Sequence, residues 1–289
     1  MVRMQFSIEL DYEIIDRPSD FIINIHAAQT AHQFVVTEQL SLSQPLAPAI
    51  YADPVYGTRY MRLTAAPGPL SVRYAATVDL NHHFASPDSL VEVPISQLPR
   101  ETLPYLYPSR YCQSDRLGKF VTWEFGHVQP GYARVLAIQD WVFKRTEFLS
   151  GSTNSSTSAT DTIIERAGVC RDFAHLTIAL CRASNIPARF ATGIDYGADP
   201  ILGPTDFHAY VEVFLTDRWY LIDSTGISPP MGLIRLGTGR DAADVSFATV
   251  FGSVRSGAPI ISITAVDDPA SGFTVPWRCA EALSTQGAA

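Results

Sequence analysis

A cysteine at the start of a predicted helix is the residue best placed for covalent chemistry in this sequence. Gly168 comes before the apolar segment Phe173–Cys181, and Cys170 falls in the first turn of the helix that this segment predicts. The first N–H groups of a helix have no partner within it, and the helix dipole adds roughly half a positive charge there. A thiol in that position loses its proton more readily, and the thiolate is the nucleophile. The sequence therefore predicts a cysteine nucleophile beside N–H groups that can hold an oxyanion.

A histidine and an aspartate lie on two predicted strands that follow this helix. The strands cover residues 207–215 and 218–223, with a tight turn between them. If Leu215 pairs with Arg218, His208 and Asp223 share one face of the hairpin as diagonal neighbours, with Cα atoms roughly 7–8 Å apart. His208 can then accept the thiol proton while Asp223 fixes the imidazole tautomer and stabilises the imidazolium.

Each of these residues alone is more often structural than catalytic. A single cysteine on an apolar helix usually serves packing, as we expect for Cys181, and a lone histidine on a strand is usually structural. The combination of glycine, helix-start cysteine, histidine and aspartate is what favours an enzyme. Arg171, His175 and Arg182 form a polar stripe along the same helix, and His175 on this stripe is expected to be structural.

Gln113 is the candidate for a second oxyanion donor. It lies in the polar and aromatic segment Pro108–Leu117. The segment is explained first by a helix cap through Ser109 or Ser114, and alternatively by a wall of the cleft in which the Gln113 amide donates to the oxyanion. Both interpretations stay open at this point.

The elements around these residues predict two parts. Residues 1–95 show short alternating or β-branched segments separated by turn clusters, which is typical of a small β-sandwich-like or open-barrel domain. Prolines punctuate residues 79–110 and mark the boundary. We therefore expect an N-terminal β domain over 1–95 and a catalytic domain over 96–289 that includes a C-terminal extension. The predicted strands of the first part are Gln5–Ile14, Phe21–His26, Phe34–Leu40, Thr58–Leu63 and Leu70–Val78.

Around the cysteine helix, the pattern predicts a helix over 132–149 and a strand over 189–196. Two loops of small or turn-forming residues, 150–160 and 197–206, are expected to border the cleft. The chain from residue 226 reads as irregular, with strands at 245–251 and 260–266.

Composition excludes several classes of function. The chain of 289 residues has a net charge of −8 and no Lys/Arg cluster, which argues against nucleic acid and polybasic membrane binding. No apolar run approaches the roughly 18 residues of a membrane span, and the acidic N-terminus is not a signal peptide. The four cysteines include no CxxC pair, so we expect free thiols in a reducing cytoplasm, and we expect no metal or cofactor.

The cysteine segment Gly168–Leu176 resembles the cysteine motif of the transglutaminase-like (transglutaminase/protease) superfamily. The strand Phe207–Val213 and the segment Trp219–Asp223 are similar to its histidine and aspartate motifs, with 38 residues from cysteine to histidine and 15 from histidine to aspartate. The resemblance covers residues 100–225, the β domain resembles the extra domain of the bacterial members, and Gly239–Asp244 resembles a segment that follows the triad.

The resemblance implies an α+β fold: a papain-like transglutaminase core, with the cysteine helix packed on an antiparallel sheet, preceded by a small all-β domain. It implies that Cys170 is the nucleophile, His208 the general base and Asp223 the orienting group, in a reaction on an amide or ester carbonyl of a peptide or protein substrate. No clustered acidic sites of the calcium-dependent animal enzymes are present, so no metal dependence is expected.

The resemblance does not choose what accepts the acyl group. Hydrolysis, as in a cysteine peptidase or amidase, is the expected reaction because water is always present. A true transglutaminase that uses an amine acceptor is the alternative, and a binding or scaffold module that retains the fold without catalysis is a second alternative. The oligomeric state is not readable from the sequence.

Overall fold

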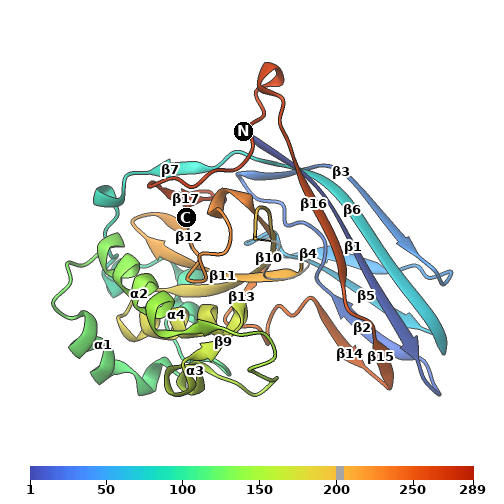
Figure 1. The fold of residues 1–289 in the computed structure, drawn as a ribbon, viewed down its shortest axis with the longest axis horizontal. Coiled ribbons are helices and arrows are strands. Elements are labelled where there is room, and N and C mark those ends of the chain that lie inside the picture. The colour runs from blue at the N-terminus through green and yellow to red at the C-terminus, as the bar shows by residue number, and fades with distance from the viewer. Residues whose placement is uncertain (200–204) are drawn as a thin grey trace.

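The computed structural model describes residues 1–199 and 205–289, and its long strands and its helices occupy different parts of the molecule (Figure 1). Long strands form a β-rich part, and helices α1–α4 gather around a separate antiparallel sheet. The expected α+β fold, with a cysteine helix on an antiparallel sheet after an all-β region, is confirmed.

Alternating burial builds the β-rich part. Along β1 every second residue from Val2 to Ile14 is buried, because successive side chains of a strand point to opposite faces. One sheet runs β15-β1-β6-β3, with β16 also on β1, and the other runs β14-β2-β5-β4. The five strands predicted in residues 1–95 are confirmed. The bounds are β1 Val2–Ile14, β2 Ser19–Ile23, β3 Gln33–Leu42, β4 Ala49–Ala52, β5 Arg59–Ala65, β6 Gly68–Leu80, β14 Ala248–Phe251, β15 Val254–Ser256 and β16 Ile260–Val266.

The C-terminal part of the chain returns to the N-terminal sheets. Strand β16 pairs with β1 from Arg3 to Glu9, and β14 pairs with β2. The strands expected at 245–251 and 260–266 thus add to the sheets that residues 1–95 form. The physical reason is that the free edges of β1 and β2 leave backbone N–H and C=O groups unpaired, and the returning strands satisfy them.

The second part has a central antiparallel sheet in the order β12-β11-β10-β13. Its elements are α1 Gly118–Phe125, α2 Tyr132–Arg145, α3 Ala159–Glu165, α4 Cys170–Ala183, β10 Ala188–Asp195, β11 Phe207–Leu215, β12 Arg218–Ile222 and β13 Leu233–Gly239. Two small pairs, β7 His83–Ala85 with β17 Ala282–Ser284 and β8 Glu147–Phe148 with β9 Ala167–Gly168, lie outside it. Short 3₁₀ turns are η1 Pro87–Ser89, η2 Ile95–Gln97, η3 Arg100–Tyr105, η4 Ser114–Arg116, η6 Pro230–Gly232 and η7 Pro269–Ser271.

Helix α4 lies at the centre of this part. Every residue from Asp172 to Arg182 is buried, and the helix packs against β10, β11, α2 and α3. The opposite face of the sheet contributes Ala191, Tyr210 and Leu221 to the hydrophobic core of the β-rich part. The sheet is therefore covered on both faces, which holds the end of α4 and the strands beside it in fixed positions.

Strand β13 was not predicted. The sequence was read as irregular from residue 226 onward, but Leu233–Gly239 pairs with β10 and every one of its residues is buried. A strand buried on both faces shows no polar alternation, and Arg235, Gly237 and Gly239 weaken its apolar pattern further. The pairing with β10 is what identifies this segment as a strand.

Candidate active site

Cys170 is the first residue of helix α4, as the sequence predicts. The residue before it, Val169, is extended, and its N–H donates to the Asp172 carboxylate at 2.9 Å. The Thr153 hydroxyl donates to the same carboxylate oxygen at 2.8 Å. A Cβ on Gly168 would lie 2.7 Å from the Asp172 Cβ, so this position requires glycine. Gly168 and Asp172 thus fix where the helix begins, and with it the place of the thiol.

His208 and Asp223 meet as the predicted register requires. Strands β11 and β12 pair Leu215 with Arg218, so the predicted register is confirmed. His208 Nε2 lies 3.2 Å from Asp223 Oδ2, and the two side chains are almost fully buried. Thr225 donates to the other carboxylate oxygen from its backbone N–H at 3.0 Å and from its hydroxyl at 2.7 Å. These bonds hold the Asp223 carboxylate in one orientation toward the imidazole.

The thiol lies on the other side of the imidazole. Cys170 Sγ is 3.9 Å from the carbonyl oxygen of Phe207, the residue before His208. Since Asp223 occupies Nε2, the nitrogen left for the thiol is Nδ1. Burial lowers the pKa of His208, but the Asp223 carboxylate and the hydrogen bond with Cys170 outweigh it and raise that pKa well above the ordinary value. The pKa of Asp223 is lowered, because the charge of His208 and the Thr225 donors overcome the opposing effect of burial. The arrangement favours an imidazolium between a carboxylate and the thiol.

A cavity of about 820 Å³ opens at this group. Cys170 and His208 line it, as do residues from both predicted border loops. The middle of the second loop, residues 200–204, lies outside the described residues. The other walls come from the segment 242–248 and from Ile263 on β16. The β-rich part therefore contributes directly to the wall of the cavity.

The segment Gly239–Asp244 is tied to the polar stripe of α4. Buried Arg182 donates to the carbonyl oxygen of Arg240 at 2.6 Å. His175 Nε2 accepts the N–H of Ala242 at 3.2 Å, and Asp241 accepts the N–H of Tyr111 at 2.9 Å. The His175 and Arg182 end of the stripe thus has a structural role. It positions a cavity wall, a role that the sequence did not suggest although the segment itself stood out.

Gln113 lies apart from this group. It immediately precedes η4, which packs on α4, and it is not among the described residues that line the cavity. The side-chain oxygen Oε1 of Gln113 is buried and has no hydrogen-bond partner in the described part of the chain. The structure therefore does not bring Gln113 to the cavity that Cys170 and His208 line. The backbone N–H of Cys170 lies at the start of α4, where N–H groups have no partner within the helix.

Asp195, at the end of β10, is a cavity residue that the sequence analysis missed. It is 5% exposed. The strand at 189–196 pairs with the strand at 207–215. With this pairing, the alternation that puts Asp223 on the face of His208 also puts Asp195 there, so the sequence contains a signal for it.

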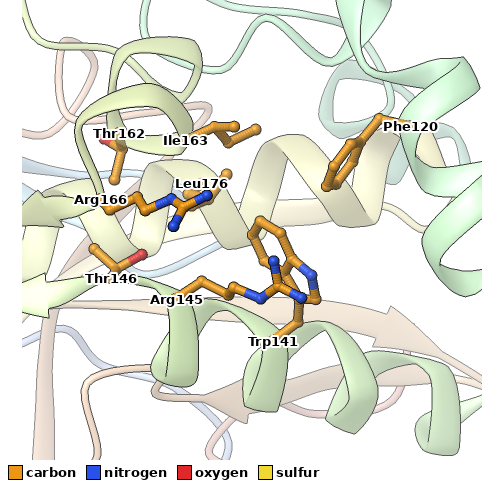
Figure 2. Close-up of a pocket in the computed structure, with 8 residues that line it drawn as sticks. All are labelled: Phe120, Trp141, Arg145, Thr146, Thr162, Ile163, Arg166 and Leu176. Carbon is orange, nitrogen blue, oxygen red and sulfur yellow. The ribbon is translucent and has the colours of Figure 1, made fainter.

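A second hollow of about 130 Å³ lies among helices α1–α4, away from Cys170 (Figure 2). Arg145 and Arg166 extend into it from the ends of α2 and α3, and Arg145 lies 5.2 Å from the centre of the Trp141 ring. Among the residues that line it there is no thiol, imidazole or carboxylate. It therefore offers none of the groups that the cysteine chemistry needs.

Other chemistry-bearing residues stand alone. All four cysteines are free thiols, with Cys112 and Cys181 buried. Within residues 1–199 and 205–289, no three His, Cys, Asp or Glu side chains gather in a way that could hold a metal ion. The same described ranges contain no helix long and apolar enough to span a membrane.

Two family models match the chain. The transglutaminase-like superfamily matches residues 121–224, which contain Cys170, His208 and Asp223, and the N-terminal domain of bacterial transglutaminases matches residues 2–101. A crystal structure from Cytophaga hutchinsonii, provisionally named a cysteine protease, is 40% identical over 98% of this chain and 97% of that one, with a TM-score of 0.89.

Curated relatives match over a shorter region. An uncharacterized protein of Mycobacterium leprae is 32% identical over 39% of this chain and 42% of its own length. One from Mycobacterium bovis is 33% identical over 34% of this chain and 35% of its own length. The matched region spans less than half the length of these relatives.

Proposed function

Because this chain belongs to the transglutaminase-like superfamily, we propose that Cys170, His208 and Asp223 form a catalytic triad that cleaves amide bonds of peptides or proteins. The observation that carries the proposal is the buried His208–Asp223 hydrogen bond of 3.2 Å beside a thiol that faces a cavity. A histidine held by a carboxylate next to a helix-start cysteine is the arrangement that nucleophilic catalysis requires.

In the first half of the reaction, the Cys170 thiolate attacks the amide carbonyl carbon and forms a tetrahedral intermediate. The N–H of Cys170 stabilises the oxyanion, because it has no partner within the helix. The His208 imidazolium gives its proton to the leaving amine, the C–N bond breaks, and a thioester remains on Cys170. Asp223 stabilises the imidazolium and keeps its ring in place throughout.

In the second half, neutral His208 takes a proton from water, and the resulting nucleophile attacks the thioester. The C–S bond breaks, the carboxylic acid leaves, and Cys170 returns as a thiolate beside the imidazolium. An amine in place of water would give a new amide by the same sequence of proton transfers. We propose hydrolysis, since the cavity is open to solvent and its border loops carry small polar residues suited to an extended peptide.

Iodoacetamide labelling resolved by site tests the triad. We expect Cys170 to be labelled rapidly below pH 7, because the raised pKa of His208 favours the imidazolium–thiolate pair. The His208→Ala variant should move this labelling to higher pH. Cys181 serves as the internal comparison, since burial raises its pKa to about 12.

Uniformly slow labelling, with no effect of His208→Ala, would contradict the triad and favour a binding module that retains the fold. Where Cys170 does prove reactive, casein and a fluorescent primary amine distinguish the two reactions. Released acid without incorporated amine would support hydrolysis. Incorporation without release would establish an amine acceptor instead.

A further inference from the structure

His208 has a carboxylate on either side of it in the sheet. Strand β10 pairs Gly193 with His208, and Asp195 lies two residues further along β10. Asp195 is therefore a diagonal neighbour of His208 on the same face, because alternate residues of a strand share a face. Asp223, which directly follows β12, is the diagonal neighbour of His208 on the other side of β11. Of these two carboxylates, Asp223 is the one that hydrogen-bonds the imidazole.

One oxygen of Asp195 lacks the partner that a buried carboxylate needs. It is 5% exposed and lines the cavity, and its Oδ2 has no hydrogen-bond partner among the described residues. The Ser228 hydroxyl lies beside it, but its geometry is not that of a hydrogen bond. A buried charge is ordinarily paired or hydrogen-bonded, since its desolvation is costly. This carboxylate is thus placed to receive a donor from a molecule in the cavity.

The charges around the cavity favour a cationic donor. Three aspartates line it: Asp195, Asp199 and Asp206. Among the described lining residues, Arg171 is the sole Lys or Arg. Its guanidinium already donates to the Thr153 hydroxyl and the Asn154 carbonyl, each at 3.1 Å. The His208 imidazolium is engaged by Asp223. Among the described lining residues, no cation is therefore hydrogen-bonded to Asp195.

We propose that Asp195 forms a subsite for a primary ammonium group of the substrate, next to the reacting thiol. The inference rests on the proposed function and deepens it, because it names a substrate feature beyond the amide bond. The ammonium group belongs either to the acyl donor, as a lysine side chain or free amino terminus, or to an amine acceptor. Its N–H groups would donate to Oδ2 and supply the missing positive charge.

The state of the carboxylate agrees with this assignment. Burial raises the pKa of Asp195, and the nearby His208 charge and Ser228 offset this only in part. A bound ammonium would lower the free energy of the ionised form, because an opposite charge within a few ångströms favours it. Asp195 acts here as a specificity-determining residue, and His208 remains the base.

Methanethiosulfonate reagents test the subsite without a known substrate. The Cys170 thiolate attacks the reagent sulfur, a mixed disulfide forms and methanesulfinate leaves. The aminoethyl reagent carries an ammonium group and the methyl reagent is neutral, so the ratio of their rates at Cys170 measures the subsite. We expect this ratio to fall at least about tenfold in Asp195→Asn, from the loss of one close charge pair.

Asp206→Asn is the matched control, since Asp206 lines the same cavity but is exposed. It should lower the ratio far less, because water screens an exposed charge. An unchanged rate with the neutral reagent in Asp195→Asn would show that the cavity is intact. Equal ratios in wild type and Asp195→Asn would overturn the subsite. If the neutral reagent reacted slowly with Cys170, and at the same rate in His208→Ala, the proposed function would be overturned instead. The two failures are therefore distinct.

Turnover then identifies the source of the ammonium group. Casein and lysine-acetylated casein are compared as acyl donors, and cadaverine and pentylamine are compared as acceptors with the same reacting end. An Asp195-dependent preference for unmodified casein assigns the group to the donor. An Asp195-dependent preference for cadaverine assigns it to the acceptor. The absence of both preferences in wild type would overturn the subsite.

Discussion

The two carboxylates beside His208 differ in their hydrogen bonds, and this difference separates their roles. Asp223 accepts two hydrogen bonds from Thr225 and one contact from the imidazole, so it is ionised and fixed. Asp195 is buried to a similar extent but has an unpartnered oxygen at the cavity. Residue type and burial are the same, and only the neighbours distinguish a proposed orienting group from a proposed binding group.

The Asp223→Asn variant should lose most of the activity while keeping the shape of the site. The loss of the carboxylate charge lowers the pKa of His208, so the imidazolium–thiolate pair becomes less favourable at neutral pH. We expect amide cleavage to slow by roughly 10²–10⁴-fold, the usual size of a general acid–base contribution.

The measurement is the pH profile of kcat/KM together with Cys170 alkylation. Both should shift to higher pH in Asp223→Asn. A profile that coincides with the wild-type profile would argue that Asp223 serves only the fold.

Three buried histidines should make the protein sensitive to mild acid. Burial lowers the pKa of His26 and His82 to about 4 and that of His175 to about 3. The unfolded value is near 6.5, so between these values the unfolded chain binds more protons and stability falls as the pH falls. Each group contributes a slope of up to about 1.4 kcal/mol per pH unit below pH 6.5.

The free energy of unfolding measured in urea between pH 7 and pH 5 checks this. His175→Gln should reduce the slope, although it also weakens the stacking on Tyr111, whose ring centre lies 4.9 Å away. Between pH 7 and about pH 6, His208 acts in the opposite direction, because its raised pKa keeps it protonated in the folded state while the unfolded chain still takes up a proton; near pH 5 it is protonated in both states. A flat profile over these pH values would contradict the neutral state of the buried histidines.

At the scale of the element, helix α4 combines a nucleophile with the means of positioning it. Its first turn places Cys170 by local contacts, in which Gly168 leaves room for Asp172. Its last turns use Arg182 to hold the segment that forms one cavity wall. One helix therefore sets both the thiol and the surface opposite it.

Removal of the Asp172 carboxylate should loosen the start of α4. Asp172→Ala leaves the Val169 N–H and the Thr153 hydroxyl without their acceptor, and the expected loss of stability is roughly 0.5–2 kcal/mol, the usual value of a helix cap. Asp172→Asn retains an acceptor oxygen and should lose less. Urea unfolding of the two variants provides the measurement, and equal losses would show that the hydrogen bond is not what matters.

At the scale of the whole molecule, a buried charge cluster joins the two parts. Glu212 on β11 binds Arg189 on β10 and Arg235 on β13, and all three are buried. Arg235 also donates to the carbonyl oxygen of Tyr56 at 2.7 Å, and its own N–H donates to Gln33 at 2.9 Å. The cluster therefore links the core sheet to the β-rich part, whose strand β16 helps to line the cavity.

Glu212→Gln should destabilise the protein strongly. It leaves two buried arginines without a carboxylate, and breaking a buried ion pair on one side costs roughly 3–5 kcal/mol. Glu9→Gln is the matched control, because its partner Arg73 is exposed and such pairs contribute about 0–1 kcal/mol. Denaturant midpoints of the two variants measure the difference. Similar midpoints would mean that the buried cluster does not hold the two parts together.

The sequence by itself determined where the residues of the candidate site lie on their elements. The local signals at Gly168 and Cys170 are contained in a few consecutive residues, and the hairpin that carries His208 and Asp223 is set by a two-residue turn and strict alternation. Local turn geometry and a period of two need no distant contact to be predicted. The five N-terminal strands followed from the same alternation.

Only the tertiary structure decided what surrounds that chemistry. The return of β14 and β16 to the N-terminal sheets, the strand β13 and the place of Gln113 outside the cavity all depend on contacts between residues far apart in the chain. The neighbours of Asp195, His208 and Ser228, likewise come from separate elements. Burial and hydrogen-bond satisfaction are properties of the packed chain, so no local pattern contains them.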